Sequence, residues 1–141
     1  MILEKQVCSL ELSKRLKELG VKQDSIFYWR RWIPIKGSSY RTPEWLLSYY
    51  RGSVDDYELI SAFTVAELGE LLPYLIEYES KKYWYHTGKV NKNNKYYKEH
   101  EVNYINDETT IGLARGNTET DARAEILIYF LEHKLMELPN E

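Results

Sequence analysis

The strongest constraint on this fold is an unbroken apolar run near the end of the chain, from Ile126 to Leu131. Thr118 favours a helix start before it, and Glu119 and Asp121 place carboxylates in the first turn, where the helix dipole stabilises them. Six consecutive apolar residues cover every side of a helix. This helix is therefore predicted to pack on a sheet with one side and on the first helix, or a second subunit, with the other.

Two further helices have clear boundaries in the sequence. Residues 9–19 repeat apolar side chains at helical spacing, and Gly20 follows at the position where helix ends favour glycine. Within residues 61–73, Thr64 and Glu67 have the spacing of a capping box, which predicts a short helix starting after Thr64.

The remaining regular segments are rich in aromatic and β-branched residues, which favour strands. Residues 25–32 and 44–50 predict a hairpin with a long loop, and a short helix starting at Thr42-Pro43 is the alternative for the second segment. Beyond the second helix, strands are expected at 74–86, 95–105 and 109–114. The order α-β-β-α-β-β-β-α predicts a single α+β domain over residues 1–141, with an antiparallel sheet packed by helices.

The cysteine content and the hydropathy of the chain indicate in which cellular compartment the protein is expected. Cys8 is the only cysteine, which excludes an internal disulfide and is typical of a reducing cytoplasm. The opening residues 1–12 lack the basic and apolar regions of a signal peptide. No apolar run approaches the roughly 20 residues of a membrane helix. We therefore expect a cytoplasmic protein that does not contact a membrane.

Basic charge and aromatic rings are concentrated in two segments. Residues 27–51 carry a net charge of +4 and residues 80–98 carry +6, so the rest of the chain carries −13 to reach the total of −3. The same segments hold 13 of the 20 aromatic residues. Cations that displace counterions and rings on which bases stack are what single-stranded nucleic acid binding requires. The alternative is that these lysines and tyrosines only keep an exposed strand edge soluble.

A nucleic-acid-binding protein would use the hairpin 81–98 and two arginines of the first segment. Its candidate residues are Lys81, Lys82, Tyr83, Trp84, Tyr85, Lys89, Lys92, Lys95, Tyr96, Tyr97, Lys98, Arg30 and Arg31. The element order over residues 64–136 also resembles a double-stranded RNA-binding domain. However, Glu119 and Asp121 stand where that domain places lysines, and carboxylates there repel phosphate. The resemblance therefore bears on the fold and argues against that function.

Catalytic and metal-binding patterns are missing from the sequence. The glycine string nearest to a phosphate-binding loop, residues 112–118, lacks the lysine of that motif. Cys8 lies on the apolar face of the first helix and is expected to be a buried structural cysteine. His86, His100 and His133 have no zinc spacing, although His86 and His100 are able to meet across a hairpin. We expect no cofactor, no metal site and no enzymatic activity.

Tyrosine and tryptophan also suit protein interfaces, where large rigid rings act as anchors. Alternation along residues 27–32 places Phe27 and Trp29 on one face of a strand and Trp32 on the other. Phe27, Trp29 and Trp32 are therefore candidate interface residues, and we expect at least one of the two faces to pack in the core. The leading hypothesis is a protein that binds a protein partner or itself, and nucleic-acid binding is the alternative.

Three distinctive segments follow one another in the chain: residues 7–29, residues 60–73 with the sequence ISAFTVAELGELLP, and residues 116–136 with the sequence GNTETDARAEILIYFLEHKLM. Together they resemble a set of small uncharacterised bacterial and prophage-associated proteins. In that set, a leucine-rich first helix, an AFTVAELGE-type capped helix and a T-E-x-D/E-A-R-A final helix recur in this order. The resemblance implies an intracellular protein from bacterial or phage DNA and brings no activity, cofactor or catalytic residue with it.

Overall fold

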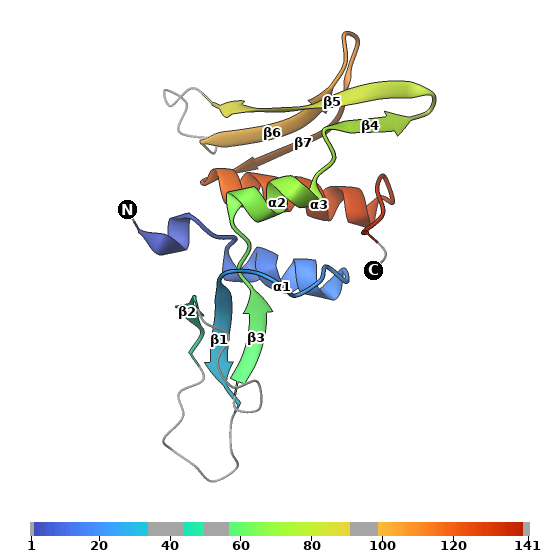
Figure 1. The fold of residues 1–141 in the computed structure, drawn as a ribbon. Coiled ribbons are helices and arrows are strands. Elements are labelled where there is room, and N and C mark those ends of the chain that lie inside the picture. Colours follow the sequence, from blue (N-terminus) through green and yellow to red (C-terminus); the bar gives the residue numbers. More distant parts are fainter. Residues whose placement is uncertain (1, 34–43, 50–56, 91–98, 140–141) are drawn as a thin grey trace.

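The chain folds into helices and two antiparallel sheets (Figure 1). The computed structural model describes residues 2–33, 44–49, 57–90 and 99–139. After a 3-10 turn at Leu3–Lys5, the helices are α1 (Leu10–Glu18), α2 (Val65–Leu71) and α3 (Glu119–Glu132). One sheet has the order β2-β1-β3 and consists of β1 (Tyr28–Trp32), β2 (Leu46–Ser48) and β3 (Tyr57–Ser61). The other has the order β4-β5-β6-β7 and consists of β4 (Leu75–Tyr78), β5 (Lys81–Lys89), β6 (His100–Ile105) and β7 (Thr110–Gly116).

The predicted α+β class is confirmed, and so is the order in which helices and groups of strands alternate. Each group contains one strand more than expected. The expected strand 74–86 is divided into β4 and β5 by a tight turn, in which Glu79 and Ser80 have φ values of 49° and 64°. Glycine or asparagine usually marks such a left-handed turn, and neither stands here. The added strand in the first group is β3, which is only five residues long.

The sequence allowed either a strand or a helix for residues 44–50. The structure has a strand there, β2. β2 pairs antiparallel with β1, with Trp29 opposite Leu47, as the hairpin interpretation requires. Thr42 and Pro43, the alternative helix start, lie outside the described residues.

α3 lies at the centre of the molecule, between the four-stranded sheet and the other two helices (Figure 1). It packs on β6 and β7 with one side and on α1 and α2 with the other, so the expected burial between a sheet and the first helix is confirmed. Ile126, Leu127 and Phe130 are fully buried, and the Phe130 ring meets Tyr104 of β6 edge to face at 4.8 Å between centroids. Among the described residues, no helix has both the length and the apolar character needed to cross a membrane.

Hydrogen bonds confirm the predicted ends of α1 and α2. The hydroxyl of Thr64 accepts from the backbone N–H of Glu67 at 3.3 Å, and the Glu67 carboxylate accepts from the backbone N–H of Thr64 at 2.7 Å. At the end of α1, Gly20 has a φ of 89°, and the N–H of Val21 donates to the carbonyl of Leu16. Both ends thus satisfy backbone groups that a helix leaves unpaired.

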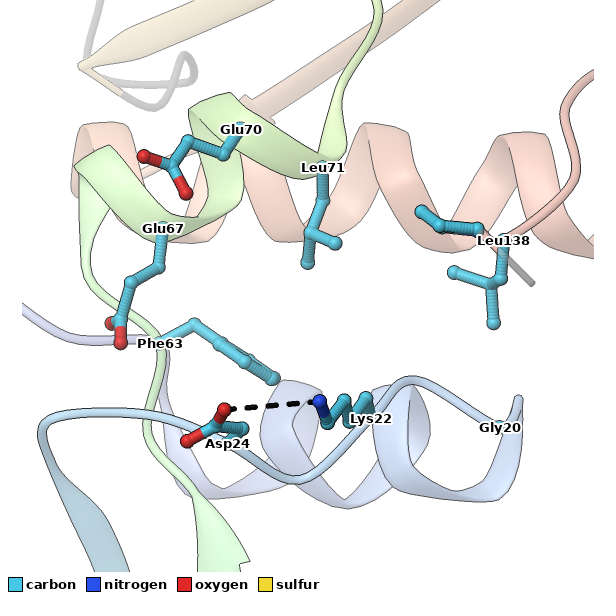
Figure 2. Close-up of a pocket in the computed structure, with 9 residues that line it drawn as sticks. Gly20, Lys22, Asp24, Phe63, Glu67, Glu70, Leu71 and Leu138 are labelled. Atoms are coloured by element: carbon cyan, nitrogen blue, oxygen red, sulfur yellow. Dashed lines mark ion pairs between the residues drawn. The ribbon is translucent and has the colours of Figure 1, made fainter. Parts of the chain in front are cut away.

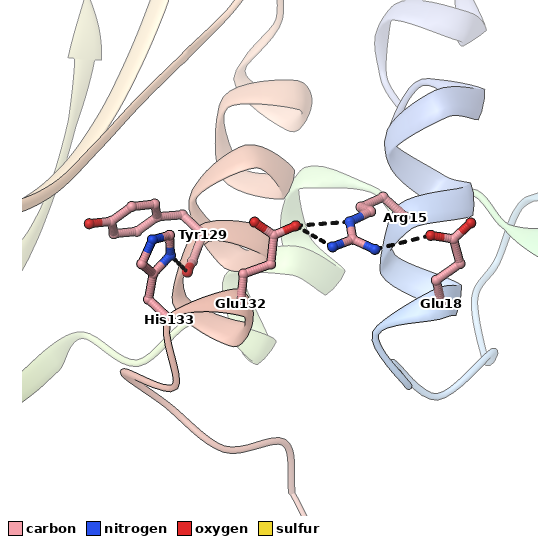
Figure 3. A network of polar contacts seen from close by, with 5 residues as sticks. All are labelled: Arg15, Glu18, Tyr129, Glu132 and His133. Atoms are coloured by element: carbon pink, nitrogen blue, oxygen red, sulfur yellow. Dashed lines mark hydrogen bonds and ion pairs between the residues drawn. The ribbon is translucent and has the colours of Figure 1, made fainter.

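Polar contacts at both ends of α1 fasten it to α3. The backbone N–H of Ser9 donates to Oδ1 of Asp121 at 2.9 Å. At the other end, Nε of Arg15 donates to Oε1 of Glu132 at 2.9 Å, and the same guanidinium reaches Glu18 at 3.1 Å (Figure 3). The carboxylate of Asp121 therefore caps the start of α1 as well as lying in the first turn of α3, a role that its own helix pattern does not reveal.

Candidate functional site

The four-stranded sheet is covered by helices on one face only, as far as the described chain extends (Figure 1). Side chains alternate along its strands, so Tyr83 and Tyr104 point to the helices and are buried, while Trp84 points away. We call the opposite side the outer sheet face, formed by Leu75, Glu77, Lys82, Trp84, His86, Glu101, Asn103, Ile105, Leu113 and Arg115.

Apolar side chains form a continuous group on the outer sheet face. Leu75, Trp84 and Ile105 lie directly opposite one another on β4, β5 and β6. Leu113 lies in the neighbouring row, on β7. Trp84 is 49% exposed and Leu113 is 50% exposed, while the other two are half-buried. Single exposed apolar residues are ordinary, but a contiguous group on one open face is characteristic of a binding surface.

A polar network lies beside this apolar group. Nδ2 of Asn103 donates to Oε1 of Glu101 at 3.0 Å, and Oε2 of Glu101 accepts from Nε of Arg115 at 2.7 Å. Asn103 is only 8% exposed, and its Oδ1 is buried without a hydrogen-bond donor from the described residues. A buried acceptor without a donor costs free energy, so this part of the network stabilises the fold less than a fully hydrogen-bonded one would.

The charges at the edge of the outer sheet face are balanced. Lys82 lies directly opposite Glu77 on the neighbouring strand, and the Arg115–Glu101 pair balances the other end. Lys81, one residue along, forms an ion pair with Glu108 at 3.3 Å. The described lysines at the start of β5 are therefore matched by carboxylates and do not form a purely basic surface.

The aromatic residues proposed for base stacking divide between the two faces of β5. Tyr83 is buried, and Tyr85 is half-buried with its ring 5.6 Å from that of Tyr104. Of the three rings that the structure describes, only Trp84 is open on the outer sheet face, and Lys89 is exposed at the strand end. The other proposed residues of the hairpin lie outside the described residues: Lys92, Lys95, Tyr96, Tyr97 and Lys98.

The two arginines proposed for nucleic acid binding lie on a different sheet from β5. The Arg30 guanidinium packs on the Tyr57 ring at 4.8 Å. Nε of Arg31 bonds Oε2 of Glu58 at 2.6 Å, and its guanidinium lies 4.8 Å from the centre of the Trp45 ring. β1 and β5 lie on opposite sides of the helices in Figure 1. In the described chain, the two basic segments therefore form separate surfaces.

The candidate interface residues of β1 make contacts within the molecule. Nε1 of Trp29 donates to the carbonyl of Cys8 at 2.9 Å, the Trp32 ring lies 4.2 Å from that of Tyr57, and Phe27 is half-buried. Trp29 and Trp32 lie on opposite faces of β1, as expected, whereas Phe27 precedes the strand. The Trp29 contact attaches the small sheet to Cys8, and the Trp32 contact lies within that sheet. Sequence reasoning assigned no role to Leu113 because an isolated leucine carries no signal of exposure.

The cysteine and histidines have structural surroundings. Cys8 is fully buried, as expected, and desolvation raises the pKa of its thiol to about 12. His86 and His100, which the sequence allowed to meet across a hairpin, do not face each other, because His86 lies opposite Asn103 and His100 opposite Lys89. His133 stacks on Tyr129 at 4.2 Å (Figure 3). Within the ranges that the structure describes, no three histidine, cysteine, aspartate or glutamate residues are grouped to hold a metal ion.

Comparisons of this chain with protein-family models, with curated proteins and with solved structures find no match.

Proposed function

We propose that this protein is a non-enzymatic interaction protein that binds a second copy of itself through the outer sheet face. The observation that carries the proposal is the group of apolar side chains around Trp84 and Leu113. About half of the surface of these two residues is exposed, on a sheet face that no helix of the described chain covers. Tryptophan contributes more to protein interfaces than most residues do, because it buries a large rigid ring.

Charge favours a second copy as the partner. One end of the outer sheet face carries Glu77 opposite Lys82, and the other end carries Glu101 paired with Arg115. In a two-fold symmetric dimer, the same patch meets itself. Because each end carries both signs, two copies can be placed so that positive end groups face negative ones, with the apolar group between them. A surface that is neutral overall and has both signs at each end is suited to such pairing.

Light scattering on the purified full chain tests the proposal. The wild type is expected to have twice the 16.8 kDa mass of the chain, and Trp84→Lys and Leu113→Lys are expected to be monomers because each places an unpaired charge in the interface. The matched control is Tyr49→Lys, which alters a 74% exposed ring next to β2, on the other sheet. A wild type that stays monomeric at every concentration, or a Tyr49→Lys variant that dissociates equally, would contradict the proposal.

Nucleic-acid binding is a second candidate function, favoured by the position of Lys82 and Trp84 next to each other on the outer sheet face. It predicts that single-stranded DNA or RNA quenches the fluorescence of Trp84 and that the affinity falls steeply with salt. A Trp84→Phe variant identifies which part of the signal comes from this residue. Absence of quenching at low salt would remove this candidate.

A cytoplasmic location is part of the proposal. Its support is the single free cysteine, Cys8, which is buried as a thiol and is typical of a reducing compartment. An origin in bacterial or phage DNA is proposed from the resemblance of the three segments named above.

A further inference from the structure

A pocket of about 430 Å³ lies on the other side of α3 from the four-stranded sheet (Figure 2). Its walls come from α2, from the segment that follows α1 and from the C-terminal segment after α3. The residues that matter for its chemistry are Asp24, Phe63, Glu67, Glu70, Leu71 and Leu138. This pocket shares no residue with the outer sheet face.

One part of the pocket is apolar. Phe63 is 2% exposed and belongs to the main core, and Leu71 and Leu138 pack against that core while remaining partly exposed. In Figure 2, Leu71 and Leu138 lie toward the end of α2, away from the two glutamates. An aliphatic or aromatic group would gain free energy from leaving water at this end.

The other part of the pocket is negatively charged. One lysine, Lys22, stands against the three carboxylates of Asp24, Glu67 and Glu70, so the lining carries a net charge of −2. The Nζ of Lys22 lies 4.0 Å from Oδ2 of Asp24, and both side chains are largely exposed. Glu70 forms no ion pair with any residue that the structure describes.

Hydrogen bonds fix one of these carboxylates in position. Glu67 accepts from the backbone N–H groups of Thr64 and Ile26, at 2.7 Å and 2.9 Å, and from the hydroxyl of Ser25 at 3.1 Å. Because both oxygens are held by the fold, the negative end of the pocket exists before any ligand arrives. Preorganised charge of this kind lowers the cost of binding.

We propose that this pocket binds an organic cation, namely a primary ammonium or guanidinium group carried on an apolar stem. The charged head lies between Glu67, Glu70 and Asp24, and the stem lies on Phe63, Leu71 and Leu138. A free alkylamine and the side chain of a lysine or arginine share this chemistry. The inference does not depend on the proposed function, because the pocket lies away from the outer sheet face.

Three probes with the same stem and different heads test the proposal on the full chain. Hexylamine, hexan-1-ol and hexanoate are titrated while backbone amide shifts of Gly20, Asp24 and Leu71 are followed by NMR. Hexylamine is expected to give saturable shifts that weaken with added salt, hexan-1-ol weaker ones and hexanoate none. If the alcohol binds as tightly as the amine, or if hexylamine moves none of these amides, the proposal is wrong.

A second titration, with a blocked lysine, distinguishes the two sources of the cation. N-acetyl-lysine-N′-methylamide presents the ammonium on a side chain, and shifts at the same amides would assign the pocket to lysine residues of a protein. Shifts with hexylamine but not with this compound would assign it to free amines. Both results support the cation site.

A matched pair of variants tests the role of charge. Glu70→Gln is expected to weaken hexylamine binding about five-fold, the effect of a partly exposed ion pair. Glu11→Gln removes an exposed carboxylate in the first turn of α1, outside the lining of this pocket, and is expected to leave the affinity unchanged. An unchanged affinity in Glu70→Gln would overturn the assignment, because Glu70 is exposed and its side chain forms no hydrogen bond or ion pair with the part of the chain that the structure describes.

Discussion

Cys8 joins three parts of the molecule through its backbone. Its N–H donates to the carbonyl of Phe63 at 2.8 Å, just before α2. Its carbonyl accepts from Nε1 of Trp29 on β1 and from the hydroxyl of Ser13 on α1, at 2.9 Å and 3.2 Å. The surrounding elements exclude water from the thiol, and this desolvation raises its pKa to about 12.

This raised pKa predicts a loss of stability at alkaline pH. An exposed thiol ionises near pH 9, whereas buried Cys8 keeps its proton until about pH 12, so the unfolded state binds fewer protons between these values. The contribution of Cys8 is complete below pH 9 and declines as the pH rises toward 12. About 1.4 kcal/mol of the free energy of unfolding is expected to be lost between about pH 8 and pH 10. Urea unfolding at both values measures it, and a Cys8→Ala variant should show a smaller loss; equal losses in both proteins would contradict the assignment.

At the scale of single elements, the sequence predicts features whose cause is local. The capping box of Thr64 and Glu67 and the glycine after α1 are visible because each satisfies backbone groups within a few residues. The turn at Glu79 and Ser80 is not visible, because left-handed backbone at such residues is imposed by the pairing of β4 with β5 rather than by local preference.

The junction between β7 and α3 requires a residue without a side chain. A Cβ on Gly116 would lie 2.5 Å from the backbone nitrogen of Ala122 and 2.9 Å from the carbonyl oxygen of Thr118. Since these are backbone atoms of the first turn of α3, Gly116→Ala is expected to lower the free energy of unfolding by roughly 2–3 kcal/mol. Gly88→Ala is the control, because the nearest atom to a Cβ there is Cε1 of His86 at 3.9 Å. Equal urea midpoints for the two variants would show that the fold does not require glycine at position 116.

At the scale of the whole molecule, the apolar run of α3 predicts its own burial, but the candidate site does not follow from the sequence. Alternation along β5 places Tyr83 and Tyr85 on one face and Trp84 and His86 on the other, with one lysine at the start of each face. Either face of β5 is therefore a plausible inner face. Only the packing of Tyr83 and Tyr104 toward α3 decides that Trp84 points outward. In the same way, no local pattern reveals that the basic segments around β1 and β5 lie on opposite sides of the helices.

The central position of α3 predicts that both sheets unfold together, as one domain. Phe130 packs on the four-stranded sheet, while contacts of α1 with Asp121 and Glu132 link α3 toward the small sheet. Phe130→Ala is therefore expected to lower the free energy of unfolding by about 3–5 kcal/mol for both sheets equally. Fluorine NMR of 5-fluorotryptophan protein in urea measures this, because Trp29 reports on the small sheet and Trp84 on the other. A helix shared by both sheets cannot unfold from one sheet alone, so the Trp84 and Trp29 resonances should disappear at the same urea concentration. If the Trp84 resonance were lost at a lower urea concentration, the chain would contain two independently unfolding units and the prediction would be wrong.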